Sequence, residues 1–448
     1  MNTEEQKLPL AVDEIQDMLK TSRKGNASNS IQNCLTVLRY DSTFQDAIKH
    51  NCLTGRTDIV KDLGWKRDST TLTDTDMKYI QLYFEQNYQL TSEKKISSAV
   101  SIISNENQYH PIRDYLNSLT WDGIERVRYA LHRYLGADAS DFTYDCLRLF
   151  MLGAVNRVFQ PGCKFETMLC LVGGQGAGKS TFFRLLAVKD EWFSDDLRRL
   201  DDDNVYRKLE GHWIIEMSEM LATANAKSIE EIKSFISRQK ETYKVPYETY
   251  PADRLRQCVF GGTTNKQDFL PKDRTGNRRF LPIKAHPEQA EKHILDDVDE
   301  ARRYIDQMWA EIMELYRAGN YSLTLSADSV RHLKEYQADF TQEDAQAGLI
   351  YAFLEDFKGH KVCSKLLYKE ALNHPNNEPA DWETRSICEI VNTGIETGDI
   401  VGWRAFKNPK RFLDYGKQKG WERIPAQPDE PHQMKFEEIA DDGNDMPW

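Results

Sequence analysis

The sequence from Met168 to Ala187 reads MLCLVGGQGAGKSTFFRLLA. Its first five residues form an apolar run typical of a buried strand, and residues 181–187 repeat apolar side chains with helical spacing. Between them, residues 173–180 fit the phosphate-binding pattern G-x-x-x-x-G-K-[ST]. In such a turn, backbone N–H groups and the helix N-terminus surround phosphate groups. The stretch therefore predicts a nucleotide site; the alternative is a glycine-rich turn that matches by chance.

The residue types of this loop predict individual roles. Lys179 would neutralise phosphate charge, and the hydroxyl of Ser180 would bind Mg²⁺. The expected cofactors are therefore ATP and Mg²⁺. The residues expected to bind the nucleotide are Gly173, Gly174, Gln175, Gly176, Ala177, Gly178, Lys179, Ser180 and Thr181.

Composition indicates a globular protein of two or three domains, because the chain has 448 residues and ordinary hydrophobic content. No apolar run approaches membrane-spanning length, and the N-terminus shows no signal-peptide pattern. The eight cysteines are scattered singly, which suggests neither a zinc site nor a disulfide framework. We expect a cytoplasmic protein without a membrane partner.

Charge is unevenly distributed. The formal net charge of −12 argues mildly against a protein coated in nucleic acid, but binding depends on local patches. Residues 404–423 contain seven basic and two acidic side chains. Residues 424–448 contain seven acidic side chains, one lysine and four prolines, a composition typical of a disordered acidic tail.

The order of patterns predicts an α/β fold with a parallel central sheet, of the P-loop NTPase (AAA+-like) class. Ser228-x-x-Glu231 has capping-box spacing and should open a helix, and residues 288–318 read as long helices. The expected strands are 167–172, 191–195, 212–217, 257–264 and 279–283. The expected domains are a mostly helical N-terminal collar or loading domain (1–105), the ATPase domain (106–340), a small basic helical or winged-helix-like module (341–425) and the acidic tail (426–448).

Two further motifs suit nucleotide hydrolysis. An apolar strand ends in Glu216, which with Ser180 could hold Mg²⁺, and Glu219 could polarise the attacking water. A second apolar strand ends in Thr263-Thr264-Asn265, where the Asn265 amide could contact the terminal phosphate. The alternatives are an ordinary strand with polar residues at its end and a common turn asparagine.

Two basic segments are further candidates for functional sites. Arg278 and Arg279 lie in a Gly/Asn turn that could present a guanidinium to a neighbouring subunit, although a solvated basic turn or salt bridges would look the same. Residues 238–247 interleave basic and aromatic side chains between segments that could pair as a hairpin, a composition that grips single strands. The alternative is an exposed hairpin of mixed charge. The expected DNA contacts are Lys240, Tyr243, Lys244 and Tyr247.

Together these motifs resemble the virulence-associated E family of phage- and genomic-island-encoded P-loop ATPases, which are related to superfamily 3 helicases. The resemblance spans about residues 105–285 and includes His110-Pro111, Trp121-Asp122-Gly123 and the 161–165 segment Pro-Gly-Cys-Lys-Phe. It implies a hexameric ring that moves on single- or double-stranded DNA, with ATP bound between subunits.

Carried over by position, the resemblance implies a role for each matched residue. Glu216 is the metal-holding acid, Glu219 the catalytic base and Asn265 the sensor. Arg278 or Arg279 is a finger acting in trans, and Lys244 lies on the DNA-tracking hairpin.

Other functional classes share a phosphate loop. A small-molecule kinase usually has an arginine-rich lid and an acceptor pocket, whereas this chain has an asparagine sensor and then an arginine pair. A non-helicase nucleotide-dependent switch that binds a host protein would not need Glu219 in addition to Glu216. A replication initiator helicase of a mobile element is the function that the sequence favours.

Overall fold

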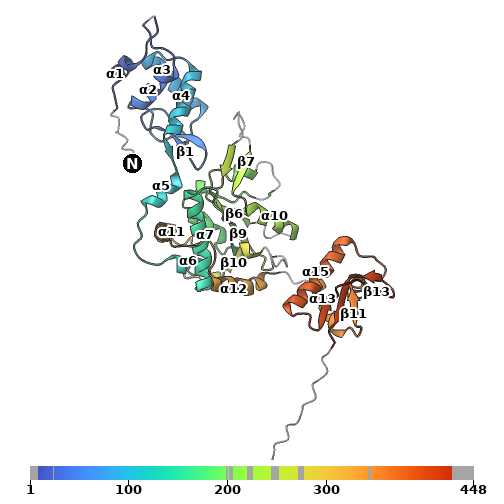
Figure 1. The fold of residues 1–448 in the computed structure, drawn as a ribbon. Helices are drawn as coiled ribbons and strands as arrows, with labels where there is room; N and C mark the ends of the chain where they lie inside the picture. Colours follow the sequence, from blue (N-terminus) through green and yellow to red (C-terminus); the bar gives the residue numbers. More distant parts are fainter. Residues whose placement is uncertain are drawn as a thin grey trace, which may run out of the picture. The chain divides into compact units, whose positions relative to one another are not determined.

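The structure is a computed structural model, shown in Figure 1. It describes residues 9–23, 25–197, 200, 205–218, 226–243, 252–270, 277–341 and 345–425. The chain separates into two compact units, residues 1–342 and 343–448. The predicted acidic tail, 426–448, lies outside the described residues.

A five-stranded parallel sheet forms the centre of the first unit, in the order β10-β4-β9-β6-β5. This confirms the predicted parallel α/β sheet, and each strand lies close to its expected position. Strand ends shift by a residue or two because pairing frays there. The strands are β4 (Met168–Val172), β5 (Phe193–Ser194), β6 (Ile214–Met217), β9 (Val259–Thr264) and β10 (Phe280–Lys284).

Both faces of the sheet are buried, which explains why its strands read as continuous apolar runs. In β4, Leu169 and Leu171 join one core cluster, whereas Met168, Cys170 and Val172 join the other. Figure 1 shows α7 and α10 on opposite sides of the sheet. The first cluster draws on α6 (Val127–Leu135), α7 (Asp141–Phe159), α8 (Lys179–Leu186), α11 (Val298–Ala318) and α12 (Ala327–Tyr336), and the second on α10 (Ala226–Ile236) and the 3-10 turn η5 (Gln337–Phe340).

A pair of stacked tryptophans fastens the sheet to its helices. The rings of Trp213, just before β6, and Trp309 of α11 are 4.3 Å apart between centroids. Both side chains are fully buried, so each indole N–H needs an acceptor. Trp213 donates to Ala154 O at 3.1 Å, and Trp309 donates to Leu186 O at 2.9 Å. The pair therefore ties β6, α7, α8 and α11 together.

The N-terminal part has its own core cluster. Helices dominate it, but it also contains a small sheet, β2-β1-β3, that the sequence did not predict. Because β3 pairs with β1, this subdomain continues past the expected boundary at residue 105. Its elements are α1 (Val12–Met18), α2 (Ile31–Tyr40), β1 (Ile48–Asn51), β2 (Arg56–Ile59), α3 (Asp74–Tyr88), α4 (Glu93–Glu106) and β3 (Gln108–Tyr109).

A histidine–glutamine relay joins this subdomain to the sheet. His110 caps α5 (Pro111–Ser118): its Nδ1 accepts the Arg113 N–H at 3.3 Å. The ring proton therefore lies on Nε2, which donates to Gln257 Oε1 at 2.7 Å. Gln257 Nε2 in turn donates to Cys52 O at 2.7 Å. Since Gln257 lies just before β9, the relay connects the N-terminal β1–β2 turn to the central sheet.

Two predicted helices are present but begin at other residues than expected. Helix α10 begins at Ala226, so Ser228 lies inside the helix and does not cap it. The expected helical stretch 288–318 is instead a short 3-10 turn, η4 (Pro287–Gln289), a loop, and then α11. Asp297 caps α11 by accepting the Glu300 N–H, and this cap sets the start of the helix.

The second unit has the element order helix, strand, helix, helix, strand, hairpin, strand, an order also found in winged-helix domains. Its sheet is antiparallel with the order β11-β15-β12, and β13 and β14 form a separate hairpin. The predicted module, helical or winged-helix-like, thus contains both helices and strands. Its elements are α13 (Ala345–Asp356), β11 (Lys361–Cys363), α14 (Ser364–Leu366) continued by the π turn η6 (Leu367–Ala371), α15 (Asp381–Thr397), β12 (Trp403–Ala405), β13 (Lys410–Phe412), β14 (Gly416–Gln418) and β15 (Gly420–Arg423).

Among the helices in the described ranges, none combines the length and the apolar character needed to cross a membrane.

We expect Trp309→Ala to lower the free energy of unfolding of the first unit by about 3–5 kcal/mol, because it removes a buried ring and leaves a cavity. Trp382→Ala is the matched control: its side chain is 68% exposed, so the change should stay within about 0.5 kcal/mol. Denaturant titration followed by circular dichroism measures both. Equal losses in the two variants would contradict the role given to the stacked pair.

The His110 relay predicts a pH dependence of stability. Burial lowers the pKa of His110 below its ordinary value of 6.5. The unfolded chain therefore takes up a proton near pH 6.5 that the folded chain resists, and the stabilisation is present above that pH and lost below it. His110→Asn retains a capping side chain but does not titrate. The difference in unfolding free energy between wild type and this variant should shrink from pH 7.5 to pH 5; a constant difference would refute the relay.

Candidate functional site

The glycine-rich loop joins the carboxyl end of β4 to α8. Gly176 and Gly178 have φ values of +80° and +78°, in the left-handed region where a Cβ is strained. A Cβ at Gly173 would lie 2.9 Å from the backbone oxygen of Ala285. Glycine is therefore required at the positions that fold the loop back onto the first turn of α8.

Lys179 lies inside the curve of this loop and is only 7% exposed. Its ammonium donates to Gly173 O at 2.8 Å, Gly174 O at 2.6 Å and Asn265 Oδ1 at 3.0 Å. Burial lowers the pKa of Lys179, and the nearby Glu216 carboxylate opposes that shift. The loop thus holds a cation among neutral acceptors that a phosphate oxygen can replace.

Glu216 is buried in β6 and faces the start of α8. Its Oε1 accepts a hydrogen bond from Ser180 Oγ at 2.6 Å and another from Thr263 Oγ1. Its Oε2 is buried, and no hydrogen-bond partner for it occurs in the described part of the chain. Burial raises the pKa of Glu216, and the bonds from Ser180 and Thr263 lower it. One carboxylate oxygen therefore remains for a further ligand.

The donor set fits Mg²⁺. This ion prefers oxygen ligands and usually takes one or two carboxylates together with hydroxyl, phosphate and water oxygens. Ser180 and Glu216 place a hydroxyl and a carboxylate 2.6 Å apart, and the second carboxylate oxygen is the buried atom without a partner. These two residues are the ones that would hold the ion.

The sheet brings these side chains together because parallel strands end at the same edge. Glu216 pairs in register with Gly261, and Val172 pairs with Thr264. A cleft of about 390 Å³ opens at that edge, within the range of small-ligand sites. Its lining is Gln175, Gly176, Ala177, Gly178, Lys179, Ser180, Thr181, Ser218, Thr263, Thr264 and Asn265. Sequence reasoning had not assigned Thr263 or Ser218 to the site; a pair of threonines ending an apolar strand was the available signal for the first.

The arginine pair lies at the other end of the sheet. Arg278 and Arg279 form the 3-10 turn η3 (Asn277–Arg279) that leads into β10, and Phe280 pairs with Met168 at the start of β4. The five residues of β4 span roughly 16 Å, so neither arginine lies near the loop of its own chain. The structure therefore does not bring these predicted residues together with Lys179.

The two arginines differ in their surroundings. The side chain of Arg279 is 21% exposed; it lies 3.3 Å from Glu166 and donates to Ser237 Oγ at 3.1 Å. The side chain of Arg278 is 73% exposed and lies 3.7 Å from the same carboxylate. Arg278 can therefore reach outward at little cost, whereas Arg279 is fixed by its neighbours.

The predicted DNA-binding segment forms a hairpin of β7 (Lys240–Tyr243) and β8 (Ala252–Leu255). Lys240 makes an ion pair with Asp253 at 2.5 Å. Lys244 and Tyr247 lie outside the described residues, as does Glu219, and only the backbone of Tyr243 is described.

A buried ion pair anchors this hairpin. Arg256 donates to Glu241 and packs over the rings of Phe235 and Phe260 at 4.5 and 5.2 Å. Breaking such a pair leaves an uncompensated buried charge, so the base of the hairpin is held firmly to the sheet and α10.

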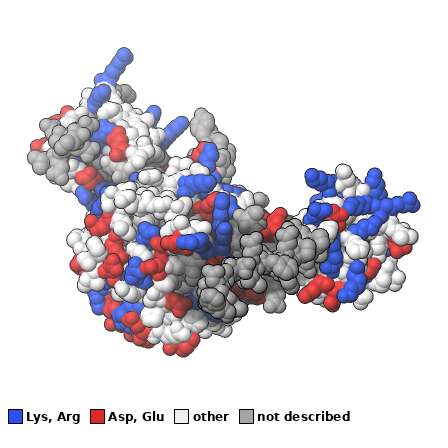
Figure 2. All heavy atoms as spheres, turned by 60° about the horizontal axis from the view of Figure 1, so that its bottom comes forward, with Lys and Arg blue, Asp and Glu red and all other residues white. Residues whose placement is uncertain are grey.

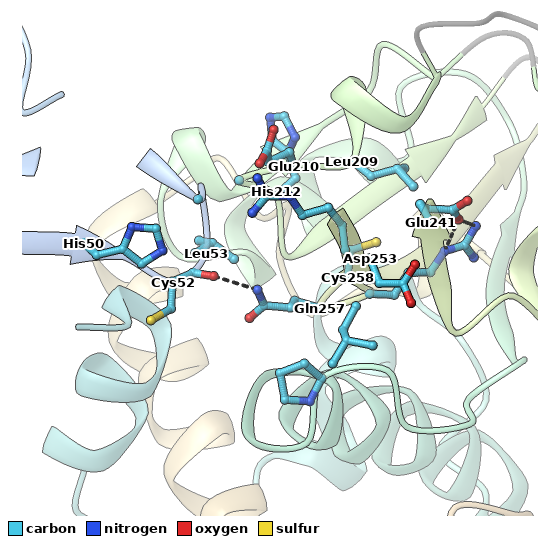
Figure 3. Close-up of a pocket in the computed structure, with 16 residues that line it drawn as sticks. His50, Cys52, Leu53, Leu209, Glu210, His212, Glu241, Asp253, Gln257 and Cys258 are labelled. Carbon is cyan, nitrogen blue, oxygen red and sulfur yellow. Dashed lines mark hydrogen bonds and ion pairs between the residues drawn. The ribbon is translucent and has the colours of Figure 1, made fainter. Parts of the chain in front are cut away.

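A second cavity, of about 270 Å³, lies beside that base and is shown in Figure 3. Figure 3 shows Cys52 and His50 of the N-terminal subdomain facing Gln257 across it, with the Gln257–Cys52 hydrogen bond dashed. The cavity is small for a ligand site. It separates the N-terminal β1–β2 turn from the hairpin, with the Gln257 relay bridging the two.

One family of known proteins matches the central part of this chain. Residues 116–342, about half of the 448 residues, match the virulence-associated protein E-like domain. No curated protein matches the chain. Apo structures of the NrS-1 C-terminal region resemble it with TM-scores of 0.42 and 0.44 and 13% identity, covering 84% of this chain and 96% of theirs; so distant a likeness supports no argument about function. The domain match shows that the chain belongs to the virulence-associated protein E-like family.

Proposed function

We propose that this protein is an ATP-dependent DNA helicase, a replication initiator of a phage or mobile genetic island. The observation that carries the proposal is the convergence of Lys179, Ser180 and Glu216 at one edge of the sheet, with a 2.6 Å bond between the last two. A lysine inside a glycine loop beside a hydroxyl–carboxylate pair is the arrangement that phosphoryl transfer from ATP needs. Membership of the family supports the same reading.

In this proposal, ATP lies with its phosphates in the glycine loop. The loop amides and Lys179 bind the phosphates, and Lys179 exchanges its present carbonyl partners for phosphate oxygens. Ser180 and Glu216 would hold Mg²⁺, which would neutralise phosphate charge. Asn265, already bonded to Lys179 at 3.0 Å, would orient the terminal phosphate or the attacking water, and Glu219 would act as the base.

The position of the arginines supports an assembly of subunits, and the expected state is a hexameric ring. The arginines lie at the amino edge of the sheet, roughly 16 Å from the loop of their own chain, so an arginine that acts on ATP must come from a neighbouring subunit. Because Arg278 is the more exposed of the two arginines, we assign the arginine finger to Arg278. Arg279 would position the turn through its contacts with Glu166 and Ser237.

The β7–β8 hairpin would contact the DNA strand in the channel of such a ring. Since Lys240 is paired with Asp253, a phosphate must compete with that carboxylate at this residue. Most of the contact is therefore expected from Tyr243, Lys244 and Tyr247.

An ATPase assay with and without single-stranded DNA tests the proposal. We expect Mg²⁺-dependent hydrolysis that DNA stimulates, and a loss of at least about a hundredfold in Lys179→Ala, because that substitution removes the charge that binds phosphate. Thermal unfolding of the variant is the control for folding. Hydrolysis at the wild-type rate in Lys179→Ala would refute the site. A hydrolysis rate that does not change when DNA is added would refute the helicase and favour the nucleotide-dependent switch.

If Arg278 is the arginine finger, substitutions of Arg278 and Arg279 should have different effects. Arg278→Ala should lower the hydrolysis rate by about a thousandfold while nucleotide binding is retained. Mixing it with Lys179→Ala subunits should restore part of the activity, since each supplies what the other lacks. Arg279→Ala should chiefly lower thermal stability. Failure of complementation in rings shown to be mixed would contradict a finger in trans.

A further inference from the structure

The second unit carries a concentration of basic side chains around the hairpin of β13 and β14, called here the wing (residues 407–419). Figure 2 shows lysine and arginine side chains gathered on this unit. Arg404 and Lys410 are paired with Glu422. Among the residues that the structure describes, four other exposed cations of this region make no ion pair: Lys407, Arg411, Lys417 and Lys419.

Two of these cations face each other. Arg411 of β13 and Lys417 of β14 are direct cross-strand partners in the hairpin register. Like charges in that position destabilise a hairpin, because their side chains project from the same face at close range. An anion placed between them would remove the repulsion.

The wing is held to the body of the unit. Lys361 of β11 donates to Arg411 O at 2.8 Å, and Tyr415 in the turn donates to Glu370 Oε1 at 3.0 Å. Phe412 is buried in the core of the unit. These contacts fix the backbone that displays the cations, so that little ordering is required when a ligand binds.

The tip of the wing displays an apolar side chain. Leu413 lies in the turn between the two strands and is fully exposed, with a relative exposure of 102%. Asp414 follows Leu413, and the cations Arg411 and Lys417 lie behind it on the two strands. Apolar side chains on a cationic surface are used by proteins that enter the DNA minor groove, where they wedge between base steps. The combination points to a duplex and not to a small anion.

Helix α15 lacks the charge for that partner. In a winged helix this is the helix expected to enter a groove, yet its charged residues are Asp381, Glu383, Glu389 and Glu396 against the single cation Arg385. Phosphates repel such a surface, so electrostatics favours the wing and disfavours the helix.

We propose that the wing binds duplex DNA, with Arg411 and Lys417 on backbone phosphates and Leu413 against the minor groove. This surface is additional to the proposed motor, which holds a strand through the β7–β8 hairpin. Because phosphate contacts carry no sequence information directly, the wing anchors the chain on duplex DNA without choosing a sequence.

The test measures binding of a labelled 30-base-pair mixed-sequence duplex and a (dT)30 strand to the full chain by fluorescence anisotropy across a salt titration. Arg411→Gln/Lys417→Gln should weaken duplex binding about tenfold or more at 0.1 M salt and lower the slope of log K against log salt by roughly two units. Leu413→Ser should weaken duplex binding with an unchanged slope. The matched control, Lys358→Gln/Arg385→Gln, removes two exposed cations of the same unit outside the wing and should bind as wild type does.

ATP hydrolysis and (dT)30 binding should be unchanged in the wing variants, which separates this inference from the proposed motor. Wild-type chain that fails to bind the duplex would overturn the inference, as would a wing variant that binds it normally. Equal losses in the Lys358/Arg385 control would also overturn it, because the contact would then be diffuse or lie on α15. None of these results bears on the nucleotide site, which the hydrolysis assay decides.

Discussion

The geometry of the proposed nucleotide site depends on one buried carboxylate. Glu216 is 1% exposed, and a carboxylate in that environment is strongly destabilising unless donors surround it. Ser180 and Thr263 supply those donors from the start of α8 and the end of β9. To place Ser180 there, the chain must turn sharply after β4, which it does through Gly178 in the left-handed region. The loop, the helix and three strands are thus positioned by the same hydrogen bonds.

The direction of the strands has a second consequence. Because every neighbour pair in the central sheet is parallel, all loops that follow a strand meet at one edge, and all turns that precede a strand meet at the other. Lys179 and Asn265 belong to the first edge, whereas Arg278 belongs to the second. A single subunit therefore separates Lys179 from the arginine pair, and this separation is why the proposed catalysis would need an assembly.

Sequence patterns predicted the structural features that are determined by residues close together in the chain. The apolar runs at 168–172 and 259–264 predicted strands, and the glycine spacing at 173–178 predicted the loop. The patterns missed the interactions that depend on contacts between residues far apart in the sequence. Thr263 reaches Glu216 across 47 positions, and the pairing of Lys240 with Asp253 depends on hairpin register. The capping box at Ser228 was misleading because α10 had already begun at Ala226. Short strands such as β1 and β11 gave too little periodicity to be recognised.

The acidic net charge does not prevent this chain from binding a polyanion, because its carboxylates are placed beside particular cations. Asp253 neutralises Lys240, and Glu422 neutralises Lys410, in pairs whose lysines remain about half exposed. Exposed pairs of this kind contribute about 0–1 kcal/mol, so a phosphate can displace the carboxylate at small cost. Within the described residues, Arg411 and Lys417 have no such partner to displace, and their mutual repulsion would favour a phosphate directly. The two hairpins should therefore bind DNA in different ways. The β7–β8 hairpin would exchange its own carboxylate for a phosphate, as a moving contact requires. The wing would gain a phosphate without giving up a carboxylate, as an anchor requires.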